Sequence, residues 1–324
     1  MAPAEKFDFI INRRSGTVLH VGEEKIRQEL LKNFGEQTGN IQFVTGDALA
    51  VSVREWAKNS AGAGRSLIIG GGDGSVLTAA TEVLGREDIA LGVLPLGTHN
   101  LFARQLGFAA DFRKAAAQYK DSAPSPVDVG SVNGQYFLCG LMLDRNSVNF
   151  YEAREHARDK KIVSAFKKVA SVISNLSGRD KVHLDVSDQG AAAKGTEHTG
   201  KIFVVTNNVL TPHGQGLKFR TPKMVVEDAL AKGSQSDGQL AFYAISSGPV
   251  DLTLILGGLV DGSWTRTKGV STQVAPELFI RSSSQQEIQI VLDGEIKKTS
   301  FPLDVKIIPQ GLKVYRPKTP ASPA

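Results

Sequence analysis

The stretch SLIIGGGDGS, residues 66–75, decides the fold of the first part of the chain. Its first four residues predict a buried strand, because Leu67, Ile68 and Ile69 follow one another without a polar break. Four of the next five residues are glycines, which free the backbone for positive φ angles and for close approach to a ligand. A helix is expected from residue 75 to residue 84. Amides at the start of such a helix bind phosphate oxygens, so the stretch predicts a phosphate site.

The segments around this stretch alternate in the way that parallel β/α units require. Strands are expected at residues 7–11, 41–44 and 89–94, and helices at 23–33, 47–59 and 98–106. From about residue 123 the pattern changes to short strands, with one long helix expected at residues 152–176. The expected strands are 127–132, 135–143, 182–186, 201–206, 239–245, 279–281, 287–292 and 305–308.

These patterns predict an α/β domain followed by an all-β domain. Residues 1–125 are expected to form a parallel β/α nucleotide-binding domain, and residues 126–316 a β-sandwich-like domain. Residues 317–324 are expected to be a disordered tail. A length of 324 residues suits two domains, and a hydrophobic content of 41% is typical of globular proteins.

Charge and cysteine content narrow the possible partners and the compartment. The net charge of +5 favours an anionic partner such as a nucleotide, nucleic acid or membrane surface. Nucleic acid is disfavoured because aromatic residues are only 7% and no known binding module is present. The lone cysteine, Cys139, can form neither an internal disulfide nor a thiolate metal site, which fits a reducing, cytoplasmic compartment.

Neither a membrane span nor an export signal is expected. The apolar run at residues 250–260 contains Asp251 and is far shorter than the roughly 18 residues of a span. The helix expected at 152–176 is basic and amphipathic, which suits peripheral contact with the anionic inner face of a membrane. Packing of its apolar stripe on its own sheet is the commoner role of such a helix. The pattern predicts no particular oligomeric state.

Two common phosphate motifs are excluded at the glycine loop. A Walker loop needs a Gly-Lys-Ser/Thr sequence, and a dinucleotide fingerprint needs a third glycine where Leu77 stands. Asp73 would repel a phosphate unless it holds Mg²⁺ or makes a structural hydrogen bond. A tight turn without any ligand is the remaining alternative.

Five motifs, in order along most of the chain, resemble the diacylglycerol kinase catalytic domain family. They are NRRSG at 12–16, GGDGS at 71–75, PLGTHN at 95–100, DG at 237–238 and DGE at 293–295. This family of lipid kinases is related to sphingosine kinases and, more distantly, to NAD kinases and phosphofructokinases. The resemblance implies transfer of the γ-phosphoryl group of ATP, with Mg²⁺, to a lipid hydroxyl such as that of diacylglycerol.

The resemblance also implies which residues bind ATP. They are Asn12, Ser15, Gly16, Thr45, Gly71, Gly72, Asp73, Gly74, Ser75 and Thr98. Asn100 is a further candidate, because it lies one helical turn from Arg104 and both side chains could face the same cleft. These positions follow the carboxyl ends of predicted parallel strands, where open α/β sheets bind their ligands. Asn100 is also explained as a helix cap, and Arg104 is equally well explained as a solvated surface charge.

Phosphoryl transfer also needs a carboxylate for the attacking hydroxyl and a cation for the developing charge. The resemblance points to Asp293 and Glu295, without deciding which takes the proton, and Asp73 is a further catalytic candidate. Asp-Gly between two strands is also a common hairpin turn. By the same resemblance, a structural Mg²⁺ is expected at Ser234, Asp237 and Gln239, which offer the oxygen ligands that it prefers.

Departures from the family pattern keep two other functions open. Leu101 follows Asn100 where many members have an aspartate, and residues 143–146 match their usual segment poorly. One alternative is a catalytically silent nucleotide- or lipid-binding regulator. The other is a kinase of the same superfamily acting on a soluble alcohol, NAD or a sugar phosphate, although the late Asp-Gly-Glu favours the lipid class.

Overall fold

The computed structural model describes residues 6–59, 64–143, 182–200, 202–207, 237–245, 269–283 and 286–318. The chain divides into two compact units, one of Met1–Val129 with Ile308–Ala324 and the other of Gly130–Ile307. Two strands, β5 (Ser122–Val132) and β16 (Leu303–Pro317), pass from one unit to the other. The last strand therefore returns the chain to the unit in which it began.

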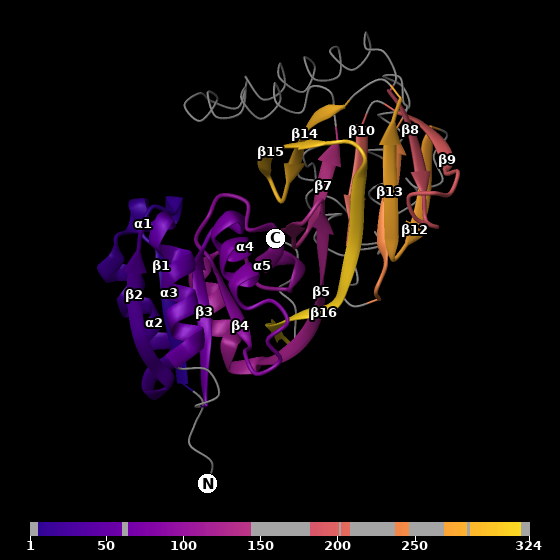
Figure 1. The fold of residues 1–324 in the computed structure, drawn as a ribbon. Coiled ribbons are helices and arrows are strands. Elements are labelled where there is room, and N and C mark those ends of the chain that lie inside the picture. Colours follow the sequence, from indigo (N-terminus) through magenta and orange to yellow (C-terminus); the bar gives the residue numbers. More distant parts are fainter. Residues whose placement is uncertain are drawn as a thin grey trace. The chain divides into compact units, whose positions relative to one another are not determined.

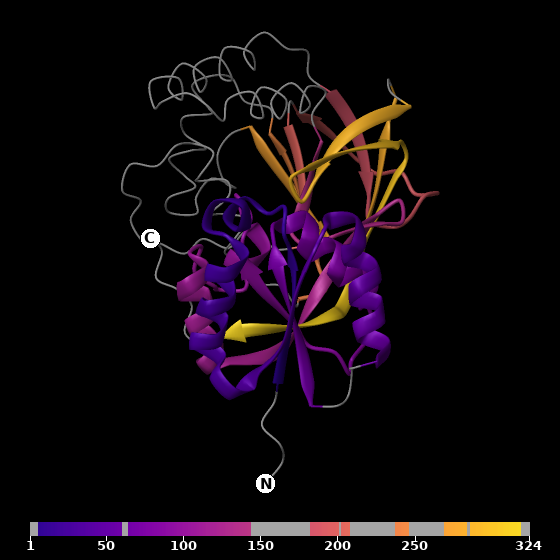
Figure 2. The ribbon, with the colours of Figure 1, turned by 90° about the vertical axis from the view of Figure 1, so that its left-hand side faces the viewer.

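A parallel sheet forms the centre of the first unit. Its strands are β1 (Lys6–Asn12), β2 (Thr38–Val44), β3 (Arg65–Gly71) and β4 (Leu91–Pro95), in the order β2-β1-β3-β4-β16. The end of β16 runs parallel to β4, with Val314 opposite Leu91. Helices cover both faces of this sheet (Figure 2). The predicted parallel β/α architecture is confirmed.

Buried residues one helical turn apart attach the long helices to the sheet. In α2 (Glu23–Phe34) these are Ile26, Leu30 and Phe34. In α3 (Gly46–Asn59) they are Leu49, Val53 and Ala57, and α4 (Asp73–Glu82) follows the glycine loop. The first unit also holds α1 (Gly16–Val21), α5 (Leu101–Gln105), α6 (Phe112–Gln118) and the short 3₁₀ turns Gly35–Gln37 and Tyr119–Asp121.

The sequence patterns missed two short helices and misjudged the start of a third. The six-residue helix α1 buries only Val18, so it carries no apolar periodicity. The α6 helix starts instead with a cap, because the Asp111 side chain accepts the N–H groups of Arg113 and Lys114. The α5 helix begins at Leu101 rather than residue 98, since Asn100 is left-handed with φ of 50°.

An aromatic cluster packs β16 into the first unit. The Tyr315 ring lies 5.3 Å from the Phe7 ring and 5.9 Å from the Tyr119 ring, measured between centroids. Its hydroxyl is 2.9 Å from the Ser66 hydroxyl. The buried Tyr119 hydroxyl accepts the Val93 N–H and donates to the Val93 carbonyl. The last strand thus contributes to the same core as the first.

The second unit consists of two sheets packed on a common core, as the predicted β-sandwich-like domain requires. One sheet has the order β12-β11-β10-β7-β14-β15, and the other contains β16-β13-β8-β9 with β5 and β6 (Figure 1). Leu141, Phe203 and Phe242 of the first sheet and Val186, Leu278 and Val305 of the second are all buried in that core. The strands are β6 (Gln135–Phe137), β7 (Gly140–Leu143), β8 (Val182–Ser187), β9 (Thr196–Gly200), β10 (Ile202–Thr206), β11 (Leu240–Ile245), β12 (Val270–Ala275), β13 (Glu277–Ser282), β14 (Glu287–Leu292) and β15 (Glu295–Ser300).

Two differences from the predicted strands concern this unit. The strand expected at 135–143 is divided in two by Leu138 and Cys139, and β9 and β12 were not predicted. Neither of these two strands has a clean apolar alternation, since β9 is TEHTG and β12 is VSTQVA. The helix expected at 152–176 lies outside the described residues.

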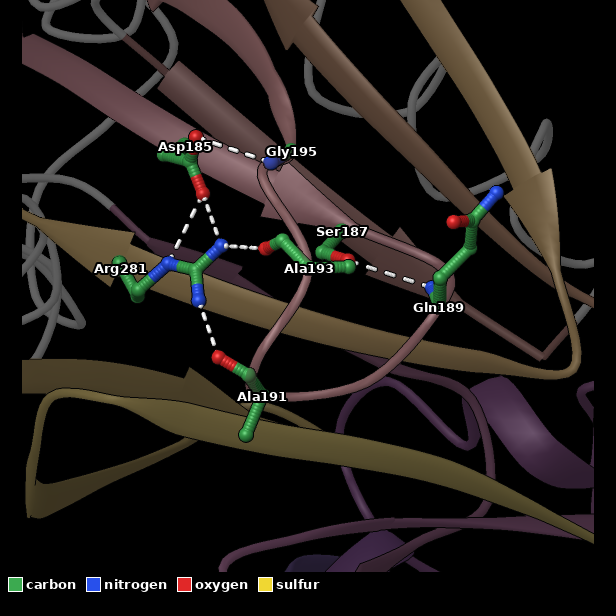
Figure 3. A network of polar contacts seen from close by, with 7 residues as sticks. All are labelled: Asp185, Ser187, Gln189, Ala191, Ala193, Gly195 and Arg281. Atoms are coloured by element: carbon green, nitrogen blue, oxygen red, sulfur yellow. Dashed lines mark hydrogen bonds and ion pairs between the residues drawn. The ribbon is translucent and has the colours of Figure 1, made fainter.

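One arginine anchors the loop between β8 and β9 (Figure 3). The Arg281 guanidinium donates to the Asp185 carboxylate through Nε and Nη2, at 2.9 Å and 2.6 Å. It also donates to the carbonyls of Ala191 and Ala193, while the second Asp185 oxygen accepts the Gly195 N–H. Arg281 thereby joins β13 to a loop with little apolar packing of its own.

Candidate active site

Three loops of the first unit meet at the carboxyl ends of β1, β3 and β4. The Leu96 N–H donates to the Gly71 carbonyl, and the Thr17 N–H donates to the Leu96 carbonyl, each at 3.0 Å. The Asn12 amide donates to the Ser75 hydroxyl at 2.9 Å. The motifs at 12–16, 71–75 and 95–100 therefore form one continuous structure, at the edge where α/β sheets bind ligands.

Close approach of backbones explains the glycines of these loops. A Cβ atom added to Gly97 would lie 2.3 Å from the Gly72 Cα, and one added to Gly71 would lie 2.5 Å from the Ser75 Cβ. The positive φ angles expected of residues 70–74 are not found, since none of these glycines is in the left-handed region. The loop thus needs small residues for space rather than for unusual dihedral angles.

Asp73 makes a structural hydrogen bond between two of the loops. Its Oδ1 accepts the Phe102 N–H at 3.1 Å, which ties the start of α4 to the start of α5. Burial raises the pKa of the Asp73 carboxyl, and the N–H groups of Phe102 and Leu101 oppose that rise. Of the two roles that the sequence left open for this carboxylate, the structure shows the hydrogen bond.

Asn100 closes the loop that follows β4. Its side-chain oxygen accepts the Gly97 N–H at 2.8 Å, and its side-chain nitrogen donates to the Gly97 carbonyl at 2.9 Å. The residue is buried, whereas Thr98 two positions earlier is exposed. The polar atoms of the Asn100 side chain, which were expected to face a nucleotide, therefore bind the loop itself. Thr98 is the more accessible of the two residues to a ligand.

The remaining residues expected to bind ATP lie around Asn12. The Asn12 side chain also accepts the Arg14 N–H at 3.0 Å, which orders the first loop. Ser15 is buried at the start of α1, and Gly16 is exposed. Thr45 directly follows β2 and accepts the Ala48 N–H, so it begins the turn into α3. All eleven candidates thus belong to strand ends, loops or helix starts at one edge of the sheet.

Asp293 and Glu295 have very different surroundings in the second unit. Asp293 and Gly294 form the two-residue turn between β14 and β15, with φ angles of 48° and 90°. The buried Asp293 carboxylate accepts the N–H groups of Leu138, Cys139 and Gly140, at 2.6, 2.8 and 3.0 Å. Glu295 is exposed and lies 2.9 Å from the Lys297 ammonium. This Asp-Gly therefore forms a hairpin turn, as its position between two strands allowed.

The expected Mg²⁺ site is described only in part. The Gln239 N–H donates to Asp237 Oδ1 at 3.1 Å, which leaves the exposed carboxylate ordered at the start of β11. Ser234 lies outside the described residues, which hold no group of three His, Cys, Asp or Glu suited to a metal. A carboxylate with carbonyl and hydroxyl oxygens nearby in sequence is nevertheless the donor chemistry that Mg²⁺ prefers.

Sequence reasoning missed two residues beside Asp293. The Thr206 hydroxyl donates to the Cys139 carbonyl at 2.7 Å, and the Asn207 amide donates to the Leu138 carbonyl at 3.0 Å. Both residues are buried. The signal in the sequence was the Thr-Asn pair at the end of the apolar strand β10, because buried polar side chains need hydrogen-bond partners.

The first unit is similar to proteins of known families. Residues 6–132 match the diacylglycerol kinase catalytic domain. A Pseudomonas aeruginosa protein named "Probable lipid kinase YegS-like" is 36% identical over 126 residues, covering 34% of this chain and 41% of the relative. A Bacillus subtilis diacylglycerol kinase is 40% identical over 74 residues, covering 22% and 24% of the two chains. The chain thus spans about two fifths of the first relative and less of the second.

The likeness in fold extends over nearly the whole chain. A crystal structure of a diacylglycerol kinase from Bacillus anthracis superposes with a TM-score of 0.64 at 19% identity, covering 98% of this chain and all of that one. At this identity the likeness shows a shared fold. No helix in the described part of the chain is long and apolar enough to cross a membrane.

Proposed function

We propose that the chain is an ATP-dependent lipid kinase of the diacylglycerol kinase catalytic domain family, whose model residues 6–132 match. It transfers the γ-phosphoryl group of ATP to a lipid hydroxyl such as that of diacylglycerol. The observation that carries the proposal is the junction of three loops at one edge of the parallel sheet, joined by the hydrogen bonds of Gly71, Leu96 and Asn12. Such an edge is where α/β proteins bind nucleotides.

The glycine loop provides the phosphate contacts in this proposal. Backbone amides of residues 71–75 and the positive end of α4, a helix of ten residues, stabilise phosphate oxygens. Asn12, Ser15, Gly16, Thr45 and Thr98 surround the same loop and contact other parts of ATP. Asp73 and Asn100 act by holding the loop that follows β4, because their side chains bind its backbone.

The second domain supplies the remaining chemistry. The pair Asp293 and Glu295 provides the group that accepts the proton of the lipid hydroxyl as the phosphoryl group is transferred. Ser234, Asp237 and Gln239 would hold a structural Mg²⁺, and Mg²⁺ bound with ATP would neutralise negative charge on the phosphates. In this division of labour residues 1–125 bind ATP and residues 126–316 bind the acceptor, in a cytoplasmic protein that contacts the inner membrane face peripherally.

Transfer of labelled γ-phosphate tests the proposal. Wild type is incubated with Mg²⁺, ATP and mixed micelles of diacylglycerol, sphingoid bases and other lipid alcohols, beside NAD and sugar phosphates. We expect labelled lipid from wild type, little from Asp73→Ala, and wild-type amounts from the control Asp88→Ala. Asp88 is an exposed residue paired with Arg86, so the control removes the same charge outside the three loops.

Two outcomes would redirect the proposal. Label only in NAD or a sugar phosphate would make the chain a kinase of a soluble alcohol. ATP binding without any labelled product would favour the silent regulator, which the departure at Leu101 already motivates.

A further inference from the structure

The Asp293 carboxylate lies within a buried network of hydrogen bonds. It accepts three consecutive amides, those of Leu138 and Cys139 in the connection between β6 and β7 and that of Gly140 at the start of β7. The Asp293 N–H in turn donates to the Gly140 carbonyl at 3.0 Å. The turn between β14 and β15 and the connection between β6 and β7 are therefore joined by four hydrogen bonds from one residue.

Thr206 and Asn207 bind the other side of the same connection. They donate to the carbonyls of Cys139 and Leu138, while Asp293 takes the amides. The backbone polar groups of this connection are thus bound by side chains from the turn between β14 and β15 and from the end of β10. Networks of this kind are stiff, because moving one member leaves buried polar groups without partners.

We propose that Asp293 is a positioning residue for phosphoryl transfer and does not itself accept the proton of the lipid hydroxyl. Three amide donors stabilise the ionised carboxylate, so a proton at this site would have to displace bonds that favour the anion. Glu295, two residues further and exposed at the start of β15, instead pairs with the Lys297 ammonium at 2.9 Å. This inference rests on the proposed function.

The positioning acts through the backbone. Asp293 fixes the two-residue turn from which β15 begins, and Glu295 is paired with Leu292 directly across that turn. A displacement of the turn is therefore passed to Glu295 without an intervening flexible segment. Misplacement of a reacting group by about 1 Å can cost roughly a hundredfold in rate.

Kinetics of three variants separate positioning from proton transfer. In Asp293→Asn the side-chain NH₂ group would face the Leu138 N–H, so two hydrogen-bond donors would oppose each other. We expect kcat to fall by about 10- to 100-fold, with KM for ATP unchanged. The acidic limb of the pH profile of kcat should remain in this variant and disappear in Glu295→Gln. Thr206→Val removes the hydroxyl that binds the Cys139 carbonyl and introduces no titratable group, and it should lower kcat in the same direction.

Hydrogen exchange of the amides of Leu138, Cys139 and Gly140 provides a second readout. Exchange should be faster in Asp293→Asn and Thr206→Val and unchanged in Glu295→Gln. Loss of the acidic limb in Asp293→Asn with amide protection intact would overturn the inference. If Asp293→Asn does not fold, Thr206→Val decides, and wild-type kcat with wild-type exchange in that variant would also overturn it. Exchange needs no acceptor, so a wild type that phosphorylates no lipid counts against the proposed function alone.

Discussion

Replacement of Gly97 by alanine should separate the two loops that meet at the candidate phosphate site. The added Cβ would lie 2.3 Å from the Gly72 Cα and 2.9 Å from the Asn100 side-chain oxygen. Carbon atoms normally approach no closer than about 3.5 Å, so one backbone must move by roughly 1.2 Å. Overpacking of this kind typically costs about 1–3 kcal/mol. If the strain falls on the loop conformation that binds ATP, affinity falls by roughly 5- to 150-fold.

Calorimetric titration with a non-hydrolysable ATP analogue measures this loss. Gly46→Ala is a matched control, because a Cβ at Gly46 has its nearest neighbour, the Asn12 amide, at 3.7 Å. We expect wild-type affinity in the control and weakened binding in Gly97→Ala. Wild-type affinity together with an unchanged Tm in Gly97→Ala would refute the claim that contact of the two loops builds the site.

Three further predictions concern stability and order. Asp73→Asn should raise Tm at neutral pH while lowering activity. Burial raises the pKa of the Asp73 carboxyl, so its ionisation destabilises the folded state as pH rises. An unchanged or lower Tm in this variant at neutral pH would contradict this. Burial alone would raise the pKa of Asp8, but hydrogen bonds and the charge of Arg65 lower it, so the ionised carboxylate stabilises the fold. Arg65→Met should therefore lower the free energy of unfolding in urea by about 3 kcal/mol, and this loss should shrink as pH falls below 3.8. A loss that does not depend on pH would contradict the role of the Asp8 charge. Arg281→Ala should speed tryptic cleavage after the exposed Lys194, because the variant loses the bonds that hold this loop. Mass spectrometry of timed digests measures the rate, and an unchanged rate would mean that other contacts hold the loop.

Much of the candidate site in the first unit could be predicted from the sequence. The order strand, glycine turn, helix around residues 66–75 is a property of neighbouring residues, and β3 and α4 follow it closely. The meeting of this loop with residues 12–16 and 95–100 was expected from the shared edge of a parallel sheet. The use of the Asn100 side chain within its own loop was not predictable, since it depends on a left-handed backbone at a non-glycine residue.

The sequence by itself determined the parallel β/α order of the first unit, the all-β character of the second and the position of the phosphate loop. These features follow from apolar periodicity and glycine placement within a few residues. Only the tertiary structure decided that β16 joins β4, and that Asp293 binds amides 153 to 155 residues away while Glu295 remains exposed. The physical reason is that hydrogen bonds over such separations depend on which strands pair, and no local pattern in the chain specifies that choice.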